Sequence, residues 1–286
     1  MRVALVSLPR WFALPVSTSA IVLGGIISGA SIPALALATA IGMLLMAYSH
    51  TMNSWIDYVM TGFDRGATRS KKKPYTSAQN LIEDGISSRF VLESGAAYAL
   101  GALALTLVAH ALYGPLVWVP VLITIPLTFA YSYGKKLYLC ELVLFLGFGP
   151  LAALLGASLS ESPRIATSML AAAPVGLMFG FAAEAYDQWY DAEKNWDRGL
   201  RNIGALVWKH KLNIVSTVTL LSLTAYVTQI ALVLSGVLDM KTLISLLTLP
   251  ALLIMIRLGV YSRYAVLAAL GALSLYCVLI PIGELL

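Results

Sequence analysis

The sequence predicts an all-α polytopic membrane protein with nine transmembrane helices. Hydrophobic residues make up 59% of the 286 positions and charged residues only 12%, whereas soluble domains carry about 25% charged residues. Apolar stretches of about 18 residues or more, long enough to cross a bilayer as helices, recur along the whole chain. We therefore expect residues 1–286 to form a single transmembrane domain.

The predicted spans follow one another with only two long interruptions. Short linkers rich in Gly, Pro and Ser join the spans on one side, and polar segments at 56–87 and 187–211 join them on the other. Long loops on a rigid scaffold often carry function, so the site is expected there. The nine spans are 11–30, 33–55, 88–110, 115–133, 139–159, 165–186, 212–235, 242–257 and 263–283.

The distribution of basic residues predicts which side of the membrane each loop faces. Of the 19 Lys and Arg residues, only Arg164 and Lys241 fall on the side with the short linkers. Cytoplasmic loops carry an excess of Lys and Arg, so the N-terminus and both long loops are predicted to be cytoplasmic, in a multi-pass protein of the cell membrane. The net charge of +5 follows from this bias and suits anionic lipid headgroups, and it requires no nucleic-acid partner.

Two clusters of acidic and amide side chains open the two long loops. Ionisable groups near a membrane helix end are costly to place, so a functional site is the default interpretation of such clusters. Residues three, four or seven apart share a helix face, which applies to most members of each cluster. The first cluster is Asn53, Asp57 and Asp64 in NSWIDYVMTGFDRG, and the second is Glu184, Asp187, Asp191 and Asp197 in EAYDQWYDAEKNWDRG.

The two clusters together favour a magnesium site that holds phosphate. Mg²⁺ prefers oxygen ligands and usually takes one or two carboxylates together with substrate phosphate. Basic residues downstream could stabilise a diphosphate leaving group: Lys71, Lys72, Lys73, Arg198 and Arg201. In a membrane protein this combination indicates chemistry on a lipid diphosphate. The alternative is that the acids are solvated groups that balance nearby Lys and Arg.

These motifs resemble those of the UbiA superfamily of intramembrane aromatic prenyltransferases, over most of the chain. NSWIDYVMTGFD and DQWYDAEKNWDRGLRNIGALV resemble its two aspartate-rich motifs, and PRWFALPVS, KKPYTSAQNLIEDGIS and YSYGKKL resemble segments near the diphosphate. The resemblance implies nine helices around a central cavity, with the active site at the cytoplasmic face.

The resemblance also implies roles for individual residues. The implied catalytic residues are Asp57, Asp187, Asp191 and Tyr131. Substrate binding falls on Arg10, Asn53, Lys73, Lys135 and Arg198. Metal binding falls on Asn53, Asp57, Asp64, Asp187 and Asp191, with Mg²⁺ as the cofactor.

The implied reaction transfers a polyprenyl group from a prenyl diphosphate to an aromatic acceptor and releases diphosphate. The segments DYVMTGFD and CELVLFLGFGPLAALLGA are similar to those of the 1,4-dihydroxy-2-naphthoate polyprenyltransferases of menaquinone synthesis. The implied acceptor is therefore a quinone precursor. The prenyl tail would lie between helices, in contact with membrane lipid.

Three other functions remain open from the sequence. Within the prenyltransferases, the acceptor could be a lipid, geranylgeranylglyceryl phosphate, of archaeal ether-lipid synthesis. A CDP-alcohol phosphotransferase would carry its acids in one stretch with an Ala-Arg between them, which is absent here. An ion-coupled transporter would place its acids near the bilayer midplane on broken helices, whereas these lie at one face.

Overall fold

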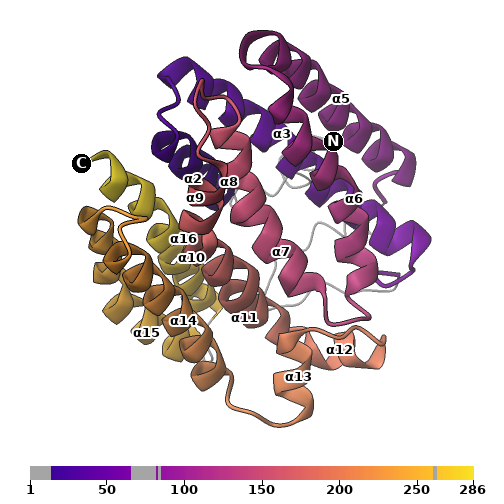
Figure 1. The fold of residues 1–286 in the computed structure, drawn as a ribbon. Coiled ribbons are helices and arrows are strands. Elements are labelled where there is room, and N and C mark those ends of the chain that lie inside the picture. Colours follow the sequence, from indigo (N-terminus) through magenta and orange to yellow (C-terminus); the bar gives the residue numbers. More distant parts are fainter. Residues whose placement is uncertain (1–13, 66–81, 83–84, 260–262) are drawn as a thin grey trace.

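The computed structural model describes residues 14–65, 82, 85–259 and 263–286, and every regular element within these ranges is a helix (Figure 1). This confirms the predicted all-α fold. The helices that build the bundle are α2 (Leu14–Ile27), α3 (Ile32–Trp55), α5 (Ser88–Tyr113), α6 (Trp118–Gly134), α7 (Cys140–Phe148), α8 (Pro150–Ala157), α9 (Ile165–Ala171), α10 (Ala173–Gly176), α14 (Ile214–Leu234), α15 (Thr248–Gly259) and α16 (Arg263–Leu285).

Each of the nine predicted spans contains at least one described helix, within the part of the chain that the structure describes. Eight helical runs in the described part of the chain are long and apolar enough to cross a membrane, and α2 is a shorter apolar helix of 14 residues. In Figure 1, α3, α5 and α6 lie on one side of α7 and α8, whereas α14, α15 and α16 lie on the other. Helix α16 packs against α2, so the last span contacts the first.

Small residues allow α2 and α8 to approach each other closely. A Cβ atom on Gly156 would lie 1.8 Å from the carbonyl oxygen of Ile21, and one on Gly24 would lie 2.1 Å from that of Ala153. Membrane helices associate through such contacts because lipid offers no hydrophobic driving force between them. The two glycines therefore fix how α2 packs against the centre of the bundle.

The first acid cluster lies where α3 changes its winding. Helix α3 begins at an N-cap, because the hydroxyl of Ser31 accepts a hydrogen bond from the backbone N–H of Ala34. It continues directly into a π-helical turn, η2 (Ile56–Met60), of the kind often found at functional sites. Gly62, at a φ of 70°, then ends the helix, as expected.

The second acid cluster lies on a broken helix. A π-helical segment, η4 (Leu177–Ala183), leads into α11 (Glu184–Trp189), and the short helices α12 (Ala192–Asp197) and α13 (Ile203–Lys209) follow. Asp191 is the N-cap residue of α12 and lies in the turn after α11. The prediction that Glu184, Asp187 and Asp191 share one uninterrupted helix face is therefore wrong for Asp191.

Candidate active site

A cavity of about 190 Å³ lies within the bundle, bordered by α2, α3, α6, α7, α8, α11 and α16. Apolar side chains line most of it, including Ile21, Leu45, Leu144, Leu151 and Phe179. Polar side chains gather at one end of the lining helices: His50, Asn53, Tyr131, Glu184 and Asp187. The cavity thus joins a polar end to an apolar chamber.

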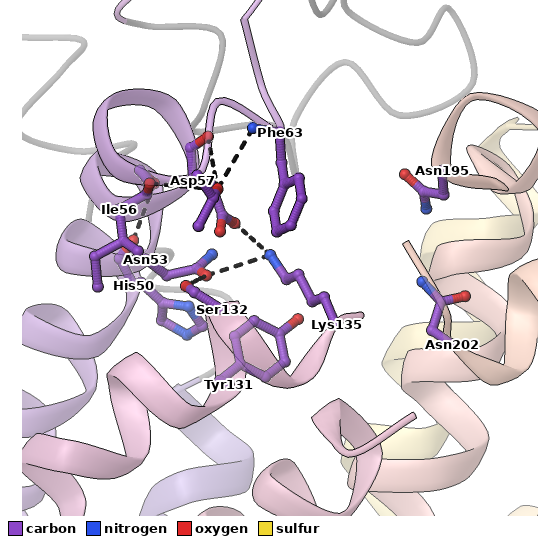
Figure 2. A network of polar contacts seen from close by, with 12 residues as sticks. His50, Asn53, Ile56, Asp57, Phe63, Tyr131, Ser132, Lys135, Asn195 and Asn202 are labelled. Carbon is purple, nitrogen blue, oxygen red and sulfur yellow. Dashed lines mark hydrogen bonds and ion pairs between the residues drawn. The ribbon is translucent and has the colours of Figure 1, made fainter. Parts of the chain in front are cut away.

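A buried ion pair forms the centre of the first cluster (Figure 2). The ammonium of Lys135, at the C-cap of α6, pairs with Oδ2 of Asp57 and donates to Oδ1 of Asn53 at 3.3 Å. Ser132 donates to the same Asn53 oxygen at 2.8 Å. Because Asn53 and Asp57 contact one ammonium, they do share a face, as their spacing predicts. The Lys135 ammonium also lies 4.7 Å from the ring centre of Tyr131.

Asp57 keeps a second oxygen that could serve a further ligand. Its side chain is fully buried, and no described residue donates a hydrogen bond to Oδ1. A buried acceptor of this kind is costly, so it usually has a role. Carboxylate and amide oxygens, which Asp57 and Asn53 offer, are the ligands that Mg²⁺ prefers. Within the described ranges, however, no three His, Cys, Asp or Glu side chains gather as a preformed metal centre.

The second cluster contributes a chain of polar contacts that begins at the cavity. Oε1 of Glu184 accepts hydrogen bonds from the Tyr131 hydroxyl at 2.8 Å and from the Gln188 amide at 2.9 Å. Asn195 donates to Oε1 of Gln188 at 3.0 Å. Asp187 also lines the cavity. These contacts tie α6, α11 and α12 together at the polar end.

The two acid-bearing segments also contact each other directly. Nη1 of Arg198 donates to the carbonyl oxygen of Phe63 at 2.8 Å. The backbone N–H of Arg201 donates to the carbonyl oxygen of Lys135 at 2.5 Å, and the ammonium of Lys136 lies 4.9 Å from the ring centre of Phe63. Segments more than 100 residues apart in sequence therefore converge at the polar end.

The remaining predicted residues divide into three groups. Arg10 and Lys73 lie outside the described residues. Asp64 is half-buried, and its backbone N–H donates to the carbonyl oxygen of Asp57 at 3.1 Å, so it stays beside the first cluster. Asp197 is exposed at the end of α12.

Sequence reasoning gave no individual role to two acids that the structure places near the site. Glu184, which the sequence analysis counted only as a member of the second cluster, lines the cavity. Glu141, at the start of α7, is buried and accepts a hydrogen bond from the backbone N–H of Ile203 at 2.5 Å, at the first turn of α13. The rarity of acids in apolar helices could have identified Glu141.

A comparison of the sequence with known protein families identifies the family of this chain. Residues 12–278 match the UbiA prenyltransferase family. The chain belongs to that family. It is a multi-pass membrane prenyltransferase, in agreement with its apolar helices. None of the curated proteins matches the sequence.

Solved structures of UbiA homologues share the fold. One from Aeropyrum pernix K1 has a TM-score of 0.69 at 19% identity, covering 96% of this chain and 98% of its own. One from Archaeoglobus fulgidus, solved with DMAPP and Mg²⁺, has a TM-score of 0.65 at 20% identity, covering 97% of both chains. A digeranylgeranylglyceryl phosphate synthase has a TM-score of 0.60 at 14% identity, covering 98% of this chain and 96% of its own.

Lys135 offers a first test of the buried ion pair in this UbiA-family chain. Lys135→Met keeps the aliphatic stem but leaves the buried Asp57 carboxylate without its cation. We expect the free energy of unfolding to fall by about 3–5 kcal/mol, because an uncompensated buried charge is costly. Thermal unfolding in detergent measures this. Lys136→Met, at the exposed neighbouring residue, is the matched control, and equal stability of the two variants would contradict the pairing.

Proposed function

We propose that this prenyltransferase moves a polyprenyl group from a prenyl diphosphate to an aromatic quinone precursor, with Mg²⁺ as cofactor. The observation that carries the proposal is the buried polar centre of Asn53, Asp57 and Lys135, which adjoins one end of a mostly apolar cavity through the lining residue Asn53. A prenyl diphosphate has the same division, with a charged head on an apolar tail. The solved homologue with DMAPP and Mg²⁺ supports this choice of ligands.

The head of the substrate is proposed to lie between the two clusters. Asn53 and Asp57 from one side and Asp187 from the other offer oxygen ligands to Mg²⁺, with Asp64 and Asp191 nearby in sequence. When bound, Mg²⁺ supplies positive charge that stabilises diphosphate as a leaving group. Lys135 adds a fixed cation at the same place, and Lys73, Arg10 and Arg198 remain proposed diphosphate ligands by resemblance.

The tail of the substrate is proposed to occupy the apolar chamber. Along α3 the lining residues run from Asn53 to Gly42, which is about 16 Å at the rise of an α-helix. This length limits how much of an extended prenyl tail can lie along the helix. A longer tail has to bend or to leave between helices into lipid.

Two further parts of the proposal are the prenyl acceptor and the side of the membrane that the polar end of the cavity faces. The acceptor that the sequence favours is 1,4-dihydroxy-2-naphthoate, for menaquinone synthesis, and the second candidate is geranylgeranylglyceryl phosphate. The likeness in fold to a digeranylgeranylglyceryl phosphate synthase favours keeping that second candidate. The near absence of Lys and Arg from the short linkers supports a cytoplasmic position for the polar end.

One assay tests the function. Purified protein is incubated with geranylgeranyl diphosphate, with and without Mg²⁺, and with either 1,4-dihydroxy-2-naphthoate or geranylgeranylglyceryl phosphate. We expect a prenylated naphthoate product by mass spectrometry and release of diphosphate that stops when EDTA is added. A product only with the glyceryl phosphate would replace the aromatic assignment. The absence of Mg²⁺-dependent diphosphate release would reject prenyl transfer itself.

A further inference from the structure

Glu184 is a carboxylate that the diphosphate site does not need. It lies one helical turn before Asp187, and both line the cavity. One turn of helix is about 5 Å, so Glu184 lies on the chamber side of the proposed diphosphate position. Its helical neighbours that also line the cavity are Ala183 and Phe179, which belong to the apolar part. Glu184 thus marks the boundary between the polar end and the chamber.

The reacting carbon of the substrate must lie at this boundary. In a prenyl diphosphate the allylic carbon is bonded directly to a diphosphate oxygen. It therefore lies one bond from the charged head, at the start of the apolar tail. The acceptor has to reach the same carbon. On the proposed substrate position, Glu184 therefore lies on the side of the diphosphate where the new bond forms.

Two hydrogen bonds hold the Glu184 carboxylate in place. The Tyr131 hydroxyl and the Gln188 amide, on different helices, both donate to Oε1, at 2.8 and 2.9 Å. Donors of this kind fix the orientation of a carboxylate. A base held in position before the acceptor binds is what general base catalysis requires.

The side chains around Glu184 indicate which acceptor group can face it. Among the described residues that line the cavity, the ionisable acids are Glu184 and Asp187. The Lys135 ammonium, 4.7 Å from the ring centre of Tyr131, is paired with Asp57. A carboxylate accepts hydrogen bonds and a hydroxyl group donates one. The hydroxyl-bearing edge of an acceptor is therefore the group that suits Glu184.

We propose that Glu184 is the general base that takes the proton from a hydroxyl group of the acceptor, which places a hydroxyl-bearing ring edge or alcohol at this end of the cavity. This deepens the proposed function and rests on it. The acceptor O–H bond breaks and its proton moves to Glu184. The electron pair left behind makes the oxygen, or a conjugated ring carbon, the nucleophile.

The bonds formed and broken balance whether the nucleophile is the oxygen or a ring carbon. A new bond forms to the allylic carbon while the bond from that carbon to the diphosphate oxygen breaks, and the electron pair leaves with diphosphate. After attack by oxygen the product is an ether. After attack by a ring carbon, the proton on that carbon is lost and the hydroxyl is restored. Glu184 releases its proton to solvent when diphosphate has left.

The test compares Glu184→Gln with wild type, using geranylgeranyl diphosphate and 1,4-dihydroxynaphthalene or its 2-carboxylate as acceptors. Glutamine keeps an oxygen that Tyr131 can reach but cannot take a proton. We expect kcat to fall about 100-fold, the usual contribution of a general base, with an unchanged KM for the prenyl diphosphate. Glu193→Gln, at an exposed acid on α12, is the matched control and should keep the wild-type rate.

A second measurement separates proton transfer from a structural role. A fluorinated naphthol loses its proton more readily without help, so the ratio of the wild-type rate to the Glu184→Gln rate should be smaller with it, whereas a packing defect would leave that ratio unchanged. Equal kcat for Glu184→Gln and wild type, or a loss that is independent of hydroxyl acidity, would overturn the assignment of Glu184. Absence of diphosphate release by wild type would instead reject the proposed function, and this inference with it.

Discussion

Replacement of Asp57 or Asp187 by alanine is expected to reduce prenyl transfer by about 100-fold or more, the scale of losing a group that stabilises developing charge. Asp187 lines the polar end of the cavity from α11, and Asp57, in the π-helical turn after α3, shares the Lys135 ammonium with the lining residue Asn53. Diphosphate release from geranylgeranyl diphosphate, measured over a range of Mg²⁺ concentrations, reports the effect. Activity above about a tenth of wild type in either variant would contradict a metal role at that position.

Folding has to be separated from catalysis in the Asp57 variant. Asp57→Ala leaves the buried ammonium of Lys135 without its counter-ion, so the variant is also expected to unfold more easily. Asp57→Asn is the second variant, because it keeps the size of the side chain and an oxygen that can accept from Lys135. It should retain more stability than Asp57→Ala and yet be as inactive. Glu161→Ala, at an exposed acid in the linker between α8 and α9, is the control for both readouts.

Gly156→Val is expected to cause the largest loss of stability of any single substitution considered. A Cβ atom at this position would lie 1.8 Å from the carbonyl oxygen of Ile21 and 2.9 Å from the backbone nitrogen of Gly25. Neither atom belongs to a side chain that can rotate away, so α2 must move off α8. Forced overpacking costs about 1–3 kcal/mol even where side chains can adjust, and a backbone clash should exceed that range.

The measurement is the thermal unfolding midpoint and the fraction of protein that stays monodisperse in detergent. Gly271→Val on α16 is the matched control, because Gly271 is exposed and a Cβ atom there has no atom within 4 Å. We expect that control to behave as wild type. If Gly156→Val matched it in both readouts, the close approach of α2 and α8 would be wrong.

The fold could be predicted largely from hydropathy, because a chain that avoids charge over repeated helix-length stretches has few alternatives to a helical bundle in a membrane. The meeting of Asn53 and Asp57 on one face could be predicted as well, since i and i+4 spacing decides it locally. The partner of that pair, Lys135, came only through the resemblance. Its contact depends on how α6 packs against α3, which no local pattern encodes.

The break after α11 could not be predicted from spacing. Asp191 fits the helical register of Glu184 and Asp187, but α13 folds back onto α11. A Cβ atom on Gly204 would lie 2.5 Å from the backbone nitrogen of Trp189, which shows how tightly the two segments pack. Tertiary packing therefore overrode the local periodicity. The contact between Arg198 and Phe63 is of the same kind, because it joins loops whose distance depends on the whole bundle.

The Asp57–Lys135 pair bears on how the protein enters the lipid during synthesis. Both residues belong to the first half of the chain, so the carboxylate and its neutralising partner are both synthesised before α7 and the helices that follow. A lone acid at this depth would oppose insertion of the early hairpins. The nascent chain can therefore pair this carboxylate within its first four helices, without a partner from the later ones.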